Sequence, residues 1–362
     1  MTDVAVQNTD KTIRRAAILG ASGYTGAEMI RLLIGHPNME IEAVTGYSRT
    51  GQLVAETYPH FAHYGLPAII KLEDVNWDRV DVVFSCLPHG TFIDNYSMIV
   101  EKVETIIDLS ADFRFDSAEE YEAIYGRDHG QSDALARRIY GLTEYARSAL
   151  KGASLVACPG CYPTATLLAL SPAFETKMID ANNIIIDAKS GVTGAGRKAK
   201  TALIYPEISD GAHAYGVGNH RHAPEIDQFI RNLSNIKSDD LSAKVRFTPH
   251  LIPMNRGMIA TCYVDLVDGV SANDLRHAYE ARYQNEPFVK VLPEGQAPQT
   301  RHVRGSNHVQ IGVFADRVDG NAIIISVIDN LMKGSSGQAL QNYNLTQGWD
   351  ETLGLNMSAI FP

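Results

Sequence analysis

The first 160 residues alternate short apolar runs with stretches whose apolar positions recur at helical spacing. Residues 13–19 predict a strand that ends at Gly20, and residues 27–33 predict a helix that stops before Pro37. Further strands are predicted over 40–45, 80–85 and 105–109. Strands that alternate with helices are typical of a mostly parallel sheet with right-handed crossovers, so this part of the chain predicts an α/β domain of the Rossmann type.

From about residue 182 the pattern changes to longer β-rich segments separated by single helices. Strands are predicted within 184–190, 244–253, 258–267, 308–317 and 322–329. This pattern predicts an α+β domain built on a mixed, largely antiparallel sheet. Such a sheet can leave one face for subunit contact, so we expect a homodimer or a homotetramer.

The last apolar pattern spans 330–348 and predicts an amphipathic helix that returns to the first domain. Its apolar positions are Leu331, Ala339, Leu340 and Tyr343. We therefore assign residues 1–157 plus 331–362 to a dinucleotide-binding domain. Residues 158–330 are assigned to a catalytic and oligomerisation domain.

The composition is that of a folded protein, because 45% of the residues are hydrophobic and 20% are charged. The net charge of -10 argues against a general nucleic-acid binder, but it permits an anionic small substrate that needs only a local basic pocket. No apolar run approaches the ~18 residues of a transmembrane helix. The polar start of the chain lacks the apolar core of a secretory signal, so we expect a cytoplasmic protein without a membrane partner.

Three glycines, Gly20, Gly23 and Gly26, lie between the first predicted strand and the helix after it. Glycine permits a sharp turn and the close approach of a pyrophosphate, which the free N–H groups of a helix start attract. A plain tight turn is the alternative, but the strand before and the helix after are the context that a dinucleotide site requires. The predicted cofactor-binding residues of this loop are Gly20, Ser22, Gly23, Tyr24, Thr25 and Gly26.

The end of the second predicted strand indicates which dinucleotide is bound. An NAD site usually places a carboxylate there, ~20 residues after the glycine run, to bind the ribose 2′-hydroxyl. Residues 44–50 hold no carboxylate, but they hold Ser48 and Arg49, whose hydroxyl and guanidinium suit a 2′-phosphate. We therefore predict NADP(H), with a solvated surface arginine as the alternative interpretation of Arg49.

The four cysteines, Cys86, Cys158, Cys161 and Cys262, do not suggest a disulfide scaffold in a chain of this length. Cys161 differs from the others because Pro163 and an apolar helical pattern follow it, which places it at or just before a helix N-terminus. The helix dipole favours a thiolate there, and a thiolate is the reactive nucleophile. We predict that Cys161 is a covalent nucleophile.

Two other interpretations of Cys158 and Cys161 stay open. The sequence C-P-G-C has the spacing of a redox pair, although such a pair is expected near a thioredoxin-like βαβ start and not in mid-chain. Half a zinc site with His220 and His222 would require both cysteines and two histidines to converge. We favour the nucleophile, without a metal ion.

A cysteine nucleophile requires an acid or a base nearby. His220 and His222 flank Arg221 on a loop, and Pro224 opens the helix predicted after it. We assign the acid/base role to His220 and an orienting or substrate-binding role to His222, but the sequence leaves the order of the two open.

Seven segments together resemble the N-acetyl-gamma-glutamyl-phosphate reductases, which are NADPH-dependent enzymes of arginine biosynthesis in the aspartate-semialdehyde dehydrogenase superfamily. The segments are GASGYTGAEMIRLL (20–33), DLSADFRF (108–115), PGCYPTA (159–165), SGVTGAGRK (190–198), HRHAPEI (220–226), PHLIPMNRGM (249–258) and DNLMKGSSGQA (329–339). The combination of GCYPTA with HRHAPEI is highly specific. Residues 45–49 depart from the arrangement in many members, which leaves the individual 2′-phosphate contacts open.

The resemblance implies reduction of N-acetyl-L-glutamyl 5-phosphate to N-acetyl-L-glutamate 5-semialdehyde and phosphate. Cys161 would attack the acyl phosphate and form a thioester, which NADPH would reduce. His220 would supply a proton as the Cys161 thiolate is expelled. The implied substrate-binding residues are Arg114, His222, Arg197 and Lys198, although a surface charge is the alternative for the arginines and the lysine. The implied further neighbours of the cofactor are Cys86, Pro88, Ser190, Gly191, Gly194 and Asn330.

Two rival functions stay open. The similar aminoadipyl-phosphate reductase of lysine biosynthesis acts on a substrate one methylene longer, and one methylene discriminates by only ~1–3 kcal/mol. A rival of another class is a catalytically silent NADP-binding sensor. Under the main hypothesis the partners are the small acyl-phosphate substrate, inorganic phosphate and further copies of the chain.

Overall fold

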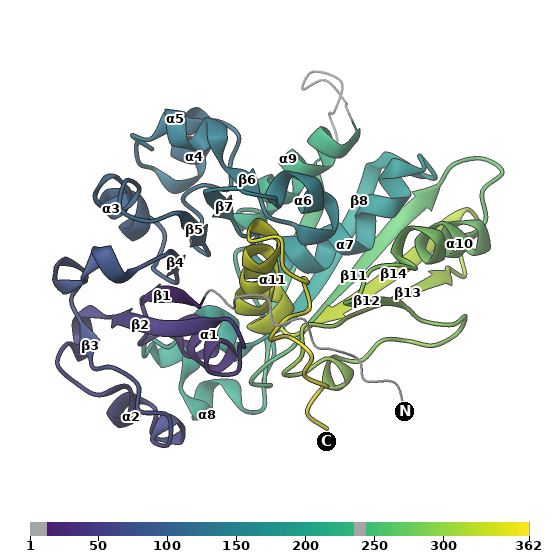
Figure 1. Cartoon of the computed structure of the whole chain (residues 1–362). Coiled ribbons are helices and arrows are strands. Elements are labelled where there is room, and N and C mark those ends of the chain that lie inside the picture. Colours follow the sequence, from purple (N-terminus) through teal and green to yellow (C-terminus); the bar gives the residue numbers. More distant parts are fainter. Residues whose placement is uncertain (1–12, 235–243, 362) are drawn as a thin grey trace, which may run out of the picture.

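The computed structural model describes residues 13–234 and 244–361, and two seven-stranded sheets lie side by side in it (Figure 1). Residues 1–12, which the sequence analysis assigned to the first domain, lie outside the described residues. Each sheet has its own apolar core, and helix α11 (Gly337–Thr346) lies between them (Figure 1).

The first sheet was predicted to be mostly parallel, and all of its strand pairs are parallel. In spatial order its strands are β3 (Ile69–Ile70), β2 (Met39–Thr45), β1 (Arg14–Leu19), β4 (Val82–Ser85), β5 (Thr105–Asp108), β7 (Leu155–Ala157) and β6 (Ile139–Tyr140). The chain moves outward from β1 to β2 on one side and restarts at β4 on the other. In open α/β sheets, ligands bind at such a reversal, outside the carboxyl ends of the strands, so the site is expected after β1 and β4.

Helices connect the strands of this sheet. They are α1 (Tyr24–Ile34), α2 (Val54–Thr57), α3 (Thr91–Ile99), α4 (Ala118–Tyr125), α5 (Ser132–Arg137) and α6 (Thr143–Leu150). Helix α1 buries Met29, Ile30, Leu32 and Leu33 at helical spacing, which is the apolar face that the sequence predicted. Burial of that face fixes the direction of α1, and therefore the position of the glycine loop at its start.

The second sheet is mixed and largely antiparallel, which confirms the predicted fold class. In spatial order its strands are β12 (Val289–Val291), β13 (Val309–Ala315), β14 (Asn321–Ile328), β11 (Met258–Leu266), β8 (Ile179–Gly191), β10 (Arg246–Ile252) and β9 (His213–Ala214). Only the pairs β8–β10 and β12–β13 among these strands are parallel.

Helices α7 (Cys161–Glu175) and α10 (Ala272–Tyr283) cover one face of this sheet, and α9 (His222–Ser234) packs on α7. A short helix, α8 (Tyr205–Ile208), lies in the connection after β8. Side chains alternate between the faces of a strand, so Ala260 and Cys262 of β11 join the core while Tyr263 points the other way. Tyr263 pairs with Ile185 and Ile323, and this row gives the uncovered face an apolar centre.

The prediction of an amphipathic helix near the C-terminus is wrong in one respect. Helix α11 is present and packs against α1, α6 and β5, but every residue of it is buried, including its four amide side chains. Those amides have partners inside the protein: Gln338 donates to Thr164 at 3.0 Å, and Asn342 donates to the carbonyl of Gly141 at 2.8 Å. Polar residues that satisfy one another in this way look like a solvent-facing side in the sequence pattern.

A fully buried ion pair joins α6 to the turn that precedes α11. The Nζ of Lys333 lies 2.6 Å from Glu144 and 2.8 Å from the side-chain oxygen of Gln341, and the side chains of Lys333 and Glu144 are 0% and 1% exposed. A charge in such a place is tolerated only while its partner is present.

We predict that Lys333→Met lowers the free energy of unfolding by about 3–5 kcal/mol, because the buried carboxyl group of Glu144 then lacks its partner. Adding Glu144→Leu to the same chain removes the stranded carboxylate and should recover most of the loss. Urea denaturation measures both. If the chain with Lys333→Met alone is as stable as the wild type, this account of the ion pair is wrong.

Candidate active site

Cys161 is the first residue of helix α7, as predicted, and Gly160 precedes it as the N-cap in an extended conformation. The thiol is partly buried beneath a turn from the other end of the chain. Gly334 of that turn approaches so closely that a Cβ atom at this position would lie 2.8 Å from the Cβ of Cys161. A side chain at residue 334 would therefore displace Cys161.

Burial changes the expected ionisation of Cys161. It raises the pKa of the thiol to about 11, although the charge of Arg114 and the backbone N–H of Tyr162 act to lower it. The helix start thus acts in the predicted direction but is outweighed by loss of hydration. Cys161 is a thiol at neutral pH in the protein without ligands, so it needs a base to become a nucleophile.

His220 and His222 both lie beside Cys161's neighbour Tyr162, with ring centroids 5.7 and 5.9 Å from the Tyr162 ring. The backbone N–H of His222 donates to Nδ1 of His220 at 3.2 Å, so the neutral His220 ring carries its proton on Nε2. Burial, together with the charge of Arg221, lowers the pKa of His220 to about 4. Neutral His220 is therefore arranged as an Nε2–H donor.

His222 lies closer to the start of α7 than its position in the sequence suggested. Its Nε2 is pressed against Gly160, where a Cβ atom would lie only 2.5 Å away. Burial lowers the pKa of His222 well below the ordinary value, and the charge of Arg114 acts in the same direction. Its buried Nδ1 has no hydrogen-bond partner among the described residues, so this ring is neutral and retains a free polar atom.

Glu225 organises this region, and the sequence analysis did not assign it a role. Its fully buried carboxylate accepts from the backbone N–H of Gly160 at 3.0 Å and from the hydroxyl of Tyr140 at 2.9 Å, and it pairs with Arg114 at 3.3 Å. The only sequence signal was a charged residue on the buried side of an amphipathic helix. Glu225 therefore joins the start of α7 to strand β6 and to the loop after β5.

Arg114, predicted to bind substrate, is held rigidly beside Cys161. Its Nε donates to the carbonyl of Cys158 and its Nη2 to the carbonyl of Leu109, each at 2.9 Å, and Glu225 binds Nη1. Although only 6% exposed, Arg114 lines the cavities on both sides of the cysteine. Its guanidinium therefore presents a fixed positive charge to an anion at Cys161.

Two cavities meet at Cys161. The larger one, of about 740 Å³, extends toward the loop of His220 and is also lined by Ser190 and Lys200. The smaller one, of about 300 Å³, extends toward the glycine loop. The residues that line both are Leu87, Leu109, Arg114, Cys161, Gly194 and His222. Cys161 is thus accessible to one ligand from each side.

The glycine loop has the shape that a dinucleotide requires. Gly20 has a φ of +83°, and a Cβ atom there would lie 2.7 Å from the carbonyl oxygen of Cys86. A Cβ atom at Gly26 would lie 2.5 Å from the carbonyl oxygen of Gly20, so the loop can close tightly onto the start of α1 only with glycine at both positions. The loop leaves the first N–H groups of α1 without a side-chain cap, as a pyrophosphate site does.

Most of the other predicted cofactor residues border the smaller cavity. They are Gly23, Tyr24, Thr25, Cys86, Pro88, Gly194 and Asn330. Ser190 lines the larger cavity instead, and Gly191 packs against the backbone of residues 254–256. Ser48 and Arg49 are exposed beyond the end of β2, where Ser22 of the glycine loop lies against Gly46.

Arg197 and Lys198, the other two predicted substrate ligands, lie apart from Arg114. Arg197 donates to the carbonyl of Ser22 at 3.1 Å, stacks on the Tyr58 ring at 4.7 Å and lines the smaller cavity, so it stands beside the glycine loop. Lys198 is exposed and lines neither cavity, whereas Lys200 lines the larger one. Both lysines follow the same glycine-rich loop, and no sequence signal separates them.

The zinc interpretation required a converging set of cysteines and histidines. Within residues 13–234 and 244–361, no three His, Cys, Asp or Glu side chains gather closely enough to hold a metal ion. The Sγ of Cys158 instead accepts from the side-chain amide of Asn342 at 3.8 Å.

Within the described residues, no helix has both the length and the apolar character needed to cross a membrane.

Family models for semialdehyde dehydrogenases match both halves of the chain: the NAD binding domain over residues 15–153 and the dimerisation domain over residues 161–330. Aspartate semialdehyde dehydrogenase II from Vibrio cholerae, complexed with ASA, has the same fold, with a TM-score of 0.69 at 17% identity over 93% of this chain and 98% of that one. The Candida albicans enzyme, solved with NADP, gives a TM-score of 0.65 at 16% identity over 92% and 98%. Fold and site thus define a dinucleotide-dependent oxidoreductase of the semialdehyde dehydrogenase class.

Closer relatives specify the family. The probable chloroplastic N-acetyl-gamma-glutamyl-phosphate reductase of Arabidopsis thaliana is 48% identical over 351 residues, which cover 96% of this chain and 85% of that protein. The N-acetyl-gamma-glutamyl-phosphate reductase of Rhodospirillum rubrum is 48% identical over 350 residues, which cover 96% and 98%. The chain belongs to the N-acetyl-gamma-glutamyl-phosphate reductase family, which confirms the predicted resemblance.

We predict that the rate of Cys161 alkylation by iodoacetamide rises about tenfold per pH unit from pH 7 to pH 10, because the thiolate fraction grows toward a pKa of about 11. Mass spectrometry of the modified peptide, with Cys161→Ser as the control, follows the reaction. A rate that levels off below pH 7 would show a preformed thiolate and would contradict the effect of burial.

Proposed function

We propose that this protein reduces N-acetyl-L-glutamyl 5-phosphate to N-acetyl-L-glutamate 5-semialdehyde and phosphate, with NADPH as the reductant, in arginine biosynthesis. The observation that carries the proposal is the position of Cys161 at the junction of two cavities, one reaching the glycine loop and the other a basic pocket. The names of the relatives across nearly the whole chain support the same reaction.

Cys161 provides the covalent step. Its sulfur attacks the acyl carbon, the carbon–oxygen bond to phosphate breaks with its electron pair on the departing phosphate, and a thioester forms. The bound cofactor supplies the hydride that reduces this thioester. The carbon–sulfur bond of the resulting thiohemiacetal then breaks, which releases the aldehyde and returns the sulfur of Cys161.

The histidines transfer the protons in these reaction steps. A neutral imidazole accepts the proton when the Cys161 thiol becomes a thiolate, and the same proton returns to the sulfur at the end. We keep His220 as this acid/base group, and its ring accepts the proton at Nε2 once its own proton has moved to Nδ1 and displaced the hydrogen bond from the N–H of His222. His222 orients the start of α7, against which its ring is packed.

Charge stabilisation comes from two directions. The backbone N–H groups at the start of α7 face a developing oxyanion at the acyl carbon. Arg114 supplies a fixed guanidinium beside the sulfur, and Lys200 adds a second cation in the larger cavity. Arg197 and Lys198 are the remaining candidates for the phosphate and the carboxylate.

The glycine loop and the residues of the smaller cavity would hold NADPH. Ser48 and Arg49 are the proposed ligands of its 2′-phosphate, because the end of β2 carries no carboxylate for a ribose hydroxyl. The NAD binding domain match agrees with a nicotinamide dinucleotide, and the solved Candida relative was studied with NADP.

The two separate sheets support a division of the chain into two domains. We propose that residues 1–157 and 331–362 form the cofactor domain and that residues 158–330 form the catalytic and oligomerisation domain. A homodimer or a homotetramer would cover the apolar row of Ile185, Tyr263 and Ile323 on the uncovered face of the second sheet. A cytoplasmic location stays a prediction, since the plant relatives are named chloroplastic.

We predict that the protein reduces NADP when N-acetylglutamate semialdehyde is supplied, and that this reduction depends on phosphate. The absorbance of the reduced nicotinamide measures the rate. Cys161→Ser should reduce the rate to the background, because serine is a far weaker nucleophile at the same position. The homologous semialdehyde one methylene longer serves as the competing substrate. Absence of turnover in the wild type, or a preference for the longer substrate, would overturn the proposal.

A further inference from the structure

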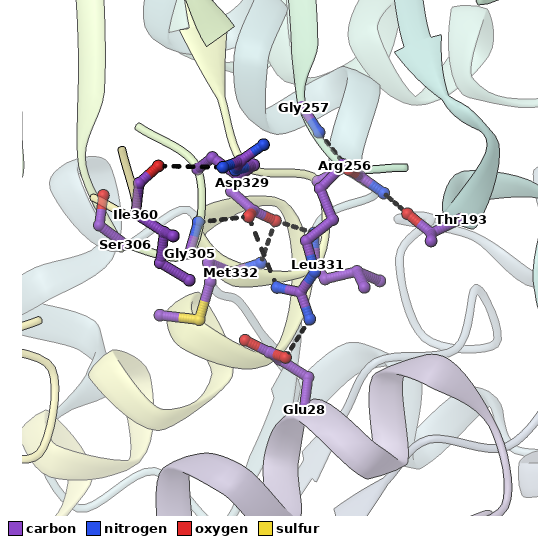
Figure 2. A network of polar contacts seen from close by, with 12 residues as sticks. Glu28, Thr193, Arg256, Gly257, Gly305, Ser306, Asp329, Leu331, Met332 and Ile360 are labelled. Atoms are coloured by element: carbon purple, nitrogen blue, oxygen red, sulfur yellow. Dashed lines mark hydrogen bonds and ion pairs between the residues drawn. The ribbon is translucent and has the colours of Figure 1, made fainter. Parts of the chain in front are cut away.

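Arg256 belongs to the segment 249–258, which the proposed reaction leaves without a role. The residue lies in the turn between β10 and β11 and sits at the centre of a polar network (Figure 2). Figure 2 shows its guanidinium between two carboxylates that come from opposite ends of the chain, Glu28 below it and Asp329 above it.

Glu28 lies on α1, two residues after Gly26 of the glycine loop, and is only 2% exposed. Arg256 binds its Oε2, while Arg31 of the same helix binds Oε1 at 2.6 Å. Burial on its own would raise the pKa of Glu28, but the two arginines bring it below the ordinary value. The carboxylate is therefore charged, and Arg256 is its link to the second sheet.

Asp329 follows β14 and is fully buried. One carboxylate oxygen accepts from the backbone N–H groups of Leu331 and Met332, at 2.8 and 3.2 Å, and the other accepts from Gly305 at 2.7 Å. Arg256 reaches that second oxygen at 3.5 Å. Asp329 thus closes the turn that carries Gly334 to Cys161.

The neighbouring Asn330 extends the network to the loop after β8, which carries Thr193. Its side chain accepts from the N–H of Gly257 at 2.8 Å and donates to the hydroxyl of Thr193 at 3.0 Å. Thr193, Asn330 and Leu331 all line the smaller cavity, opposite the start of α1. Arg256 lines no part of that cavity itself.

We propose that Arg256 is a positioning residue that fixes the two walls of the cofactor cleft relative to each other. It holds α1, and with it the glycine loop, at a set distance from the turn 329–334. Its forked guanidinium can bind two carboxylates at once, which a single ammonium group does less well. The proposal rests on the proposed use of NADPH, because it concerns the affinity of that cleft.

The test is the dissociation constant of NADPH, measured by fluorescence of the reduced nicotinamide without any turnover. Arg256→Met should weaken binding about tenfold, because the cleft must then be ordered by the cofactor itself. Arg256→Lys should fall between Arg256→Met and the wild type. The KM for phosphate should change by less than about twofold, because Arg114 and its cavity are untouched.

Arg147→Met is the matched control. Arg147 also bridges two carboxylates from separate elements, Glu286 and Glu351, but neither of these belongs to α1 or to the turn 329–334. Its loss should lower stability and leave NADPH affinity unchanged. If Arg147→Met weakens NADPH binding as much as Arg256→Met does, the effect is one of general stability and the proposal fails.

Glu28→Gln is the second variant if Arg256→Met does not fold. Its amide has the size of the Glu28 carboxylate and can still form a hydrogen bond with Arg256, but it carries no charge. Wild-type NADPH affinity in either Arg256→Met or Glu28→Gln would overturn the positioning role. A wild type that binds NADPH but does not turn over the semialdehyde would overturn the proposed reaction and leave this role standing.

Discussion

The buried carboxylate of Glu225 is the interaction on which the geometry of the site depends. It binds the N–H of Gly160, the residue before Cys161, and it neutralises Arg114. Without it the guanidinium would lie buried and unpaired, at a cost of about 3–5 kcal/mol. With it, the start of α7, the loop after β5 and the helix after the histidines form one rigid unit.

That rigid unit explains how Cys161 would react although it is buried. Burial raises the pKa of the thiol to about 11 and lowers that of His220 to about 4, so both groups are neutral before a substrate arrives. A neutral thiol becomes a nucleophile when its proton passes to a neutral imidazole whose ring nitrogen is free to accept it. The fixed charge of Arg114 then stabilises the anionic state that follows.

The parts of the site that were predictable from the sequence are those formed by residues close together along the chain. Gly20 and Gly26 stand between a clear strand and a clear helix, and Pro163 marks the helix start beside Cys161. The role of Glu225 depends on segments near residues 114, 140 and 160, which only the folded chain brings together. A single sequence carries no signal for such a meeting.

The same limit explains the errors of interpretation. The amides of α11 look like a solvent-facing stripe, although they bond to Thr164 and Gly141 in the interior. The helix start favours a thiolate at Cys161, but the desolvation that reverses the balance comes from the distant Gly334 turn and its surroundings. Local chemistry was predictable, whereas burial by remote segments was not.

The most direct test of the account is whether the acyl group is carried on the sulfur of Cys161. The protein is mixed with N-acetylglutamate semialdehyde and NADP in the absence of phosphate, and the products are followed by absorbance and by mass spectrometry of the cysteine peptide. The account predicts a rapid burst of one NADPH per site and one acyl group on Cys161, which added phosphate then removes. Reduction of NADP without an adduct on Cys161, or an adduct that persists in Cys161→Ser, would contradict it.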